Sequence, residues 1–347
     1  MLDWRFWLGL AISGVFLYLA LRQVEPAELW EALRAATLPG MAAAVGITVL
    51  QHVIRALRWG VFLDPIQKTT FKNRLSATLI GFAANCVLPA RLGEFIRANY
   101  LGITERLRSS SALGTVVVER LFDGLSIFLV LVIGLLITPF SGRWQSLGAS
   151  LNVLAMLLIA GYAVLIILII GFKWKSETCL KVLERALFFL SRRFRLRAVD
   201  ISRGFGHGLI LLRGAGSWVC ALTFSGLIWF LALTQVKAVA ISMGIDLPFS
   251  CSFLIMAMGT LGVMIPSAPG FIGTFHLAVQ YGFMVHGFRP EQGLTAAILL
   301  HACFFVPTVL LGFASFLMVH TPLPNLAARS DLGNEAPGCT AHKRLAK

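Results

Sequence analysis

The chain has 347 residues, of which 57% are hydrophobic and only 13% are charged. A soluble globular domain carries about 25% charged residues, so this composition excludes a water-soluble globule, and the high hydrophobic fraction excludes an intrinsically disordered chain. The length and the apolar fraction instead predict an all-α polytopic membrane protein, in which each spanning helix needs about 20 residues.

The net charge is +14, from 30 Lys and Arg residues against 16 Asp and Glu residues. Because cytoplasmic loops of membrane proteins are enriched in Lys and Arg, we expect these charges to contact anionic inner-leaflet lipid and not nucleic acid. The six cysteines are scattered and form no CxxC pair. The sequence therefore predicts no disulfide framework, no metal site and no cofactor.

Six apolar runs are long enough to be spanning helices. The first is interpreted as an uncleaved helix and not as a signal peptide, because no small-residue cleavage site follows it. The second is preceded by Pro39, which suits a helix N-terminus. The runs cover residues 4–21, 40–59, 112–137, 151–172, 218–243 and 294–319.

Two further apolar runs are too short to cross a bilayer and end in helix-breaking residues. Residues 75–88 would reach about 21 Å as a helix, whereas the hydrocarbon core is about 30 Å thick. Residues 253–265 are similarly short, and each run is followed by a second short helical stretch. We interpret each as a broken helix pair that enters the membrane and turns back. The breaks contain Pro89, Gly93, Pro266, Pro269, Gly270 and Gly273.

Basic residues concentrate in segments 54–74, 102–110 and 173–217, and we count Arg55 and Arg58 among the loop charges of the first segment. The positive-inside rule then places both termini in the cytoplasm if both broken pairs are re-entrant. The two pairs would enter from opposite sides, which is typical of inverted-repeat transporters. Eight full spans would also leave both termini inside, but that count fits the basic segments less well.

The expected domain organisation is simple. Residues 1–320 form one transmembrane domain, and residues 321–347 form a disordered cytoplasmic tail. Segment 173–217 contains ten Lys or Arg residues, and its leucines recur at helical spacing. That pattern predicts a basic cytoplasmic loop with an amphipathic helix on the membrane surface.

Polar residues surround the first break. Lipid cannot satisfy the backbone groups that a break exposes, so a break is tolerated where it is buried in protein or lines a polar cavity. The helix that restarts near Leu92 would aim its positive N-terminus inward, and a phosphate would suit that terminus beside an arginine. Alternatively, Pro89 and Gly93 merely end a short span while the arginines reach the interface. The candidate substrate-binding residues here are Asn85, Arg91, Glu94 and Arg97.

A second polar group lies inside the 112–137 run and consists of Glu119, Arg120 and Asp123. Glu119 would lie about 10 Å and Asp123 about 16 Å from the start of that helix. Isolated carboxylates at such depth are costly, so they must be paired or protonated. All three residues are candidates for substrate binding.

Pairing would connect these two polar groups. Arg120 points about 100° away from Glu119 around the helix, so we expect it to pair elsewhere, with Glu94. If Glu119 pairs with Arg91 or Arg97, the two groups form one buried polar site. A purely structural ion-pair network and a proton-coupled gate are the alternatives.

The second break offers fewer polar groups. We expect the helix after it to restart at Phe271 and to aim its N-terminus inward, with Thr274 as an additional hydrogen-bond donor for the substrate. Enzyme motifs are absent, since the sequence contains no Walker A, GxSxG or HExxH pattern. We therefore do not expect an enzyme.

Three motifs together resemble a known family. They are the run from Asn85 to Arg97, the Glu-Arg-x-x-Asp pattern from Val118 to Asp123, and the run from Pro266 to Thr274. They resemble the transmembrane, flippase-like domain of the lysylphosphatidylglycerol synthase family, also called the UPF0104 group, over roughly residues 5–320. The resemblance implies a lipid-translocating domain with internal pseudo-symmetry. The C-terminal synthase domain of two-part members is missing here, so aminoacyl transfer is not implied.

The sequence and this resemblance together predict a lipid flippase or lipid-transport protein of a bacterial inner membrane, with a phosphate-headed or isoprenoid lipid as its substrate. The resemblance implies that a hopanoid is one such lipid. The first alternative is an integral-membrane lipid-modifying transferase that uses Glu119 or Asp123. The second is a non-transporting partner that recruits a cytoplasmic lipid-synthesis enzyme through segment 173–217.

Overall fold

The computed structural model describes residues 4–88, 91–138 and 214–318, together with residues 153, 156 and 160. Pro89, nearly all of the expected 151–172 span, most of segment 173–217 and the 321–347 tail lie outside these residues. Within the described ranges every regular element is helical, which confirms the all-α class.

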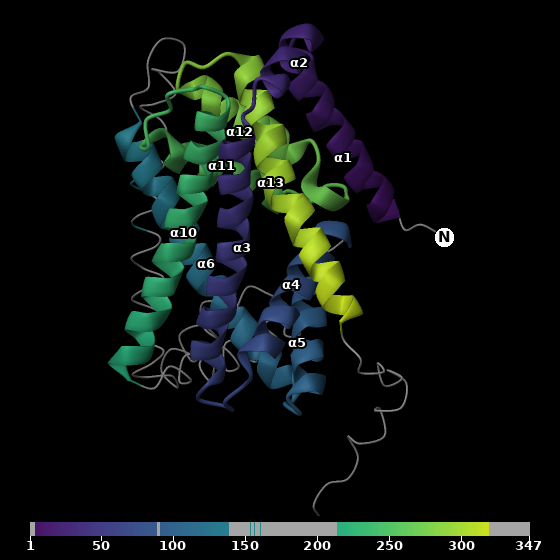
Figure 1. The fold of residues 1–347 in the computed structure, drawn as a ribbon, viewed down its shortest axis with the longest axis vertical. Coiled ribbons are helices and arrows are strands. Elements are labelled where there is room, and N and C mark those ends of the chain that lie inside the picture. Colours follow the sequence, from purple (N-terminus) through teal and green to yellow (C-terminus); the bar gives the residue numbers. More distant parts are fainter. Residues whose placement is uncertain are drawn as a thin grey trace, which may run out of the picture.

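Four described helices are long and apolar enough to cross a membrane: α3 (Leu38–Leu63), α6 (Ser109–Ile137), α10 (Ala215–Ser242) and α13 (Pro290–Leu317). In Figure 1, α3 and α10 run side by side along the long axis of the molecule, and they pack against each other. Their positions match four of the six predicted runs.

The predicted first span differs from a single straight helix. α1 (Trp4–Leu21) is followed by α2 (Pro26–Arg34), and the two meet at an angle of 88°. The two helices qualify as a fifth candidate span only if they are taken together. The described residues therefore contain four or five of the six expected spanning helices. The sequence interpretation treated residues 22–38 as a loop and missed α2, a short helix whose Glu28 forms an ion pair with Arg289 at the start of α13.

The first broken pair is a helical hairpin formed by α4 (Phe71–Val87) and α5 (Gly93–Thr104). Glu105, just after α5, accepts hydrogen bonds from the Thr70 backbone N–H at 3.0 Å and from the Asn73 amide at 2.7 Å. The end of α5 therefore returns to the start of α4. This confirms that the chain turns back at the break.

The second broken pair consists of α11 (Cys251–Met264) and α12 (Thr274–Val285), joined through a 3₁₀ turn at Pro269–Phe271. The φ angles of Gly270 and Gly273 are 81° and 90°, a region that side chains disfavour. These two positive φ angles prevent a continuous helix through the turn, so α12 starts three residues later than predicted.

The two hairpins approach the middle of the molecule from opposite ends (Figure 1). Their breaks touch there: the Arg91 guanidinium donates to the Val263 carbonyl oxygen at 2.7 Å and lies 5.7 Å from the centroid of the Phe271 ring. The two hairpins thus run in opposite directions (Figure 1), as the inverted-repeat interpretation requires.

The breaks also share a sequence repeat that the sequence interpretation missed. Residues 89–95 read Pro-Ala-Arg-Leu-Gly-Glu-Phe, and residues 269–275 read Pro-Gly-Phe-Ile-Gly-Thr-Phe. Arg91 and Phe271 occupy equivalent places, and both adopt left-handed backbone conformations, with φ of 52° and 58°. Such conformations are uncommon for residues with side chains and cluster at functional sites.

Candidate functional site

Glu119 of α6 lies at the centre of a buried ion network. Its carboxylate oxygens are 3.3 Å from an Arg58 nitrogen, 3.1 Å from an Arg97 nitrogen and 2.8 Å from an Arg120 nitrogen. Glu119 and Arg58 are fully buried, and Arg97 is 2% exposed. The predicted pairing of Glu119 with an arginine of the first break is thus confirmed for Arg97.

Asp123 lies one helical turn beyond Glu119 on the same face, as its spacing predicted. Its carboxylate oxygens are 2.7 Å from an Arg58 nitrogen, 3.1 Å from an Arg120 nitrogen and 3.4 Å from an Arg55 nitrogen. Each carboxylate therefore faces three guanidinium groups, an arrangement that compensates the cost of burying it.

Arg55 and Arg58 are functional-site residues that the sequence interpretation missed. They were counted as basic loop charges, but both lie inside α3 and point into the ion network. Two signals were available: the residues are three apart, which places them on one helix face, and the apolar run continues beyond them. They were missed because both lie near the basic end of the run, where cytoplasmic charges are expected.

Arg120 pairs differently from the expectation. Its main partners are Glu119 and Asp123 on its own helix, whereas Glu94 is 3.9 Å away, at the limit of an ion pair. The angle of 100° around the helix does not prevent the contact with Glu119, because an arginine side chain is long enough to bend back. The expectation that Arg120 pairs away from Glu119 is wrong, whereas the expected partner Glu94 lies at the limit of ion-pair distance.

Asn85 closes the first hairpin. Its side-chain oxygen accepts a hydrogen bond of 2.8 Å from the Gly93 backbone N–H, one of the unpaired donors at the start of α5. A Cβ on Gly93 would overlap the Gly81 carbonyl oxygen, so only glycine allows this approach. The same geometry aligns Arg97, whose guanidinium carbon lies 4.7 Å from the Trp59 ring centroid.

A cavity of about 450 Å³ lies where the two breaks meet. All five charged residues in the described part of its wall come from α3 to α6 and the first break, whereas α10 to α13 contribute mostly apolar side chains together with Gln235, Thr260 and His301. The polar part contains Gln51, Arg55, Asn85, Arg91, Glu94, Arg120 and Asp123, and the apolar part includes Phe82, Trp229, Ile255, Phe275 and Leu300. The cavity is thus amphipathic.

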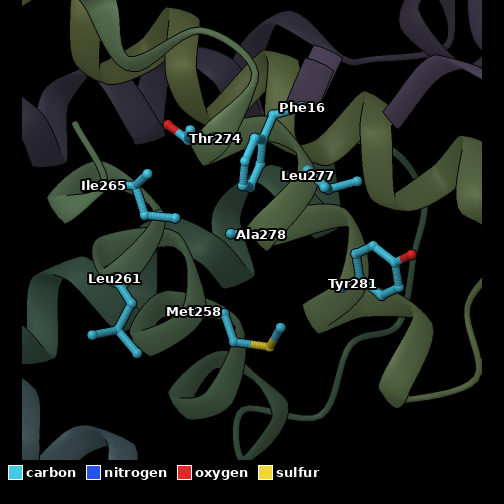
Figure 2. A pocket seen from close by; sticks show the side chains of 9 residues that line it. Phe16, Met258, Leu261, Ile265, Thr274, Leu277, Ala278 and Tyr281 are labelled. Carbon is cyan, nitrogen blue, oxygen red and sulfur yellow. The ribbon is translucent and has the colours of Figure 1, made fainter. Parts of the chain in front are cut away.

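The second break does not place Thr274 in this cavity. Thr274 is fully buried, and its hydroxyl lies 3.3 Å from the Ser267 hydroxyl and 3.4 Å from the Phe271 carbonyl oxygen. It borders a separate apolar pocket of about 410 Å³ between α1, α11 and α12, lined by Phe16, Leu277 and Tyr281 among others (Figure 2). Thr274 does not line the larger cavity because α12 starts later than expected and turns this side chain into the hairpin, and its substrate contact stays a prediction.

Two known proteins are similar to the chain over most of its length. The chain is 25% identical over 93% of its length to a protein named Glycosyltransferase AglD from Haloferax volcanii, but it spans only 55% of that relative. It is also 25% identical over 79% of its length to a protein named UPF0104 membrane protein from Methanothermobacter thermautotrophicus, and this match covers 84% of the relative.

A family model confirms the resemblance that the three motifs suggested. Residues 6–312 match the model described as the lysylphosphatidylglycerol synthase TM region. This range includes both re-entrant hairpins and every residue of the ion network. The chain therefore belongs to the lysylphosphatidylglycerol synthase transmembrane-region family.

Proposed function

We propose that the protein moves a phosphate-headed or isoprenoid lipid across a bacterial inner membrane. The observation that carries this proposal is the amphipathic cavity at the meeting point of the two breaks, in which arginines face an apolar wall. A lipid has the same two parts, since its headgroup carries charge and its chains need an apolar surface. Arginine is well suited to bind the phosphate.

The link between the two hairpins suggests how the cavity could open first to one side of the membrane and then to the other. Arg91 joins them through one hydrogen bond to the Val263 carbonyl and one contact with the Phe271 ring. In inverted-repeat transporters, one repeat rocks against the other around a fixed site near the midplane. A headgroup phosphate that competes for Arg91 would loosen this link, and both termini would remain cytoplasmic throughout.

The ion network argues for transport without chemistry. Glu119 and Asp123 each face three guanidinium groups, which favours a positioning role over proton transfer in a transferase reaction. A transferase that used Glu119 or Asp123 as its catalytic group would need that carboxylate free of such partners. We therefore propose that the protein is not an enzyme.

The partners follow from the same proposal. A membrane lipid is the substrate, and the basic 173–217 segment binds anionic lipid of the inner leaflet. The same segment is the candidate docking site for a cytoplasmic lipid-synthesis enzyme. Deleting it and measuring transport separately from enzyme recruitment distinguishes these two roles.

Reconstituted vesicles test the proposal directly. Tail-labelled phospholipids with different headgroups are incorporated, and a membrane-impermeant quencher reports how fast each label changes leaflet. Arg91→Gln should slow transport of the preferred lipid about tenfold or more, because a hydrogen bond to a charged group is worth about 1.5–3 kcal/mol. Arg289→Gln is the matched control, since Arg289 is exposed, pairs with Glu28, and neither residue lines the cavity.

Two outcomes would contradict the proposal. If the wild-type protein leaves the leaflet distribution of every lipid unchanged, it is not a flippase. If Arg91→Gln transports as well as the wild type while remaining folded, the cavity is not the route.

A further inference from the structure

The charges around the cavity do not balance within the described residues. The carboxylates number three and the guanidinium groups five, so the cluster carries a net charge of about +2 when each group is ionised. The carboxylates are Glu94, Glu119 and Asp123, and the guanidinium groups are Arg55, Arg58, Arg91, Arg97 and Arg120.

Three arginines and two carboxylates line the described part of the cavity wall, so one excess positive charge faces the cavity and the other lies directly behind the wall. Arg58 and Arg97 lie behind the wall, where Glu119 and Asp123 hold them. Arg91 lines the cavity and forms no ion pair with any described carboxylate; it meets a carbonyl oxygen and an aromatic ring instead.

Arg91 is exposed and the Arg120 side chain is 38% exposed, so solvent reaches both guanidinium groups until a ligand displaces it. Removing an ion from water costs several kcal/mol unless a counter-charge and hydrogen bonds replace the solvent. A ligand with one negative charge would leave the cluster positive, and a zwitterionic ligand would leave it unchanged. A phosphate monoester carries about −1.5 to −2 charges near neutral pH, which matches the excess.

We propose that the cavity selects lipids whose headgroup carries about two negative charges on phosphate, as in a phosphate monoester or a diphosphate. This inference rests on the proposed lipid-transport function and names the substrate class for the same site. The phosphate lies between Arg91 and Arg120, and the apolar chain leaves along the wall formed by Phe275 and Leu300. Lipids with a single phosphodiester, or with a cationic headgroup, are weaker ligands.

A matched lipid series tests the charge preference. Purified protein in uncharged detergent is titrated with lipids that share dioleoyl chains and differ only in the headgroup: phosphatidate, phosphatidylglycerol and phosphatidylethanolamine. Phosphatidate should bind at least tenfold more tightly than phosphatidylglycerol at pH 8, and phosphatidylethanolamine more weakly still. Inorganic phosphate serves as the arm that separates the lipid from the free ion, and it should compete only weakly.

Charge variants shift the preference in opposite directions. Arg91→Gln lowers the net charge of the cluster to about +1 and should reduce the preference for phosphatidate at least fivefold. Glu94→Gln raises the net charge to about +3 and should increase that preference. Arg289→Gln should leave the preference unchanged, because this surface residue does not line the cavity. Each variant is first checked for a single size-exclusion peak and an unchanged thermal midpoint.

The outcomes separate this inference from the function on which it rests. If the wild type binds and moves lipids but phosphatidate gains no advantage over phosphatidylglycerol, the charge selection is wrong while the transport function stands. If free phosphate competes as well as phosphatidate, the site is an anion site and not a lipid site. If no lipid binds or moves, the proposed function itself fails.

Discussion

The two hairpins share one backbone design and differ in the chemistry of their side chains. Both contain the Pro-x-x-(Leu/Ile)-Gly-x-Phe pattern, and both hold a residue in the left-handed region at the same place. The first hairpin carries Arg91, Glu94 and Arg97 around its break. The second hairpin, over residues 251–285, contains no Asp, Glu, Lys or Arg at all.

This difference distinguishes the residues that a broken helix requires from the residues that the cavity requires. A broken helix needs close backbone contact and internal partners for its polar groups, and both hairpins meet that need with glycines and hydroxyl or amide side chains. Ion pairs are not required, because the second hairpin folds without them. The charges of the first hairpin therefore serve the cavity and its neighbours on α3 and α6.

The largest expected effect concerns the ion network that only the first hairpin has. Glu119→Ala should abolish stable folding or lower the free energy of unfolding by about 3–5 kcal/mol, because it leaves Arg58 and Arg97 buried without their shared partner. Thermal unfolding of the purified protein measures the loss.

Thr274→Ala is the matched change at the second break, where a small hydroxyl is lost and no charge is exposed. It should cost no more than about 1.5 kcal/mol. Equal losses of unfolding free energy for the two variants would show that the ion network stabilises the protein no more than the Thr274 hydroxyl does.

The next effect tests the backbone contacts that the hairpins share. Gly93→Ala and Gly262→Ala should each destabilise the protein by about 1–3 kcal/mol through overpacking. The new Cβ would overlap the Gly81 carbonyl in the first hairpin and lie 2.7 Å from the Thr274 carbonyl in the second. Chemical or thermal unfolding monitored by tryptophan fluorescence reports both.

Gly114→Ala and Gly226→Ala are suitable controls, since no atom outside the local helix lies within 4 Å of a Cβ at either helical position. Both should be neutral or stabilising by up to about 1 kcal/mol. If only Gly93→Ala proves harmful, the two hairpins do not share the design inferred from their repeat.

The smallest expected effect concerns the cap of the first hairpin. Asn85→Ala removes the acceptor for the Gly93 N–H and should cost about 1 kcal/mol. Hydrogen exchange at the Gly93 amide should accelerate while amides in α12 keep their rates. Unchanged protection at Gly93 would mean that another group satisfies this donor.

Much of the architecture could be predicted because it depends on length and on helix-breaking residues. The short apolar runs and their Pro and Gly residues predicted both re-entrant hairpins, and the burial cost of Glu119 predicted a partner such as Arg97. These inferences use local sequence and simple energetics, which is why they succeeded.

Other parts depend on tertiary contacts that local sequence does not encode. Arg55 and Arg58 look like interfacial charges by position, and only the packing of α3 against α6 turns them inward. Thr274 was expected to face the substrate because the start of α12 was placed three residues too early. At a helix start, a shift of that size decides which side a residue faces.

The contact between α1 and the second break has a practical consequence. The Ser13 hydroxyl accepts a hydrogen bond of 2.9 Å from the Ala268 backbone N–H, and a Cβ on Gly9 would lie 3.1 Å from the Ser267 carbonyl oxygen. Any displacement of that turn must also pull on the first helix. A fluorophore attached at the exposed Tyr18 would therefore register rearrangements deep in the fold without altering a residue that lines the cavity.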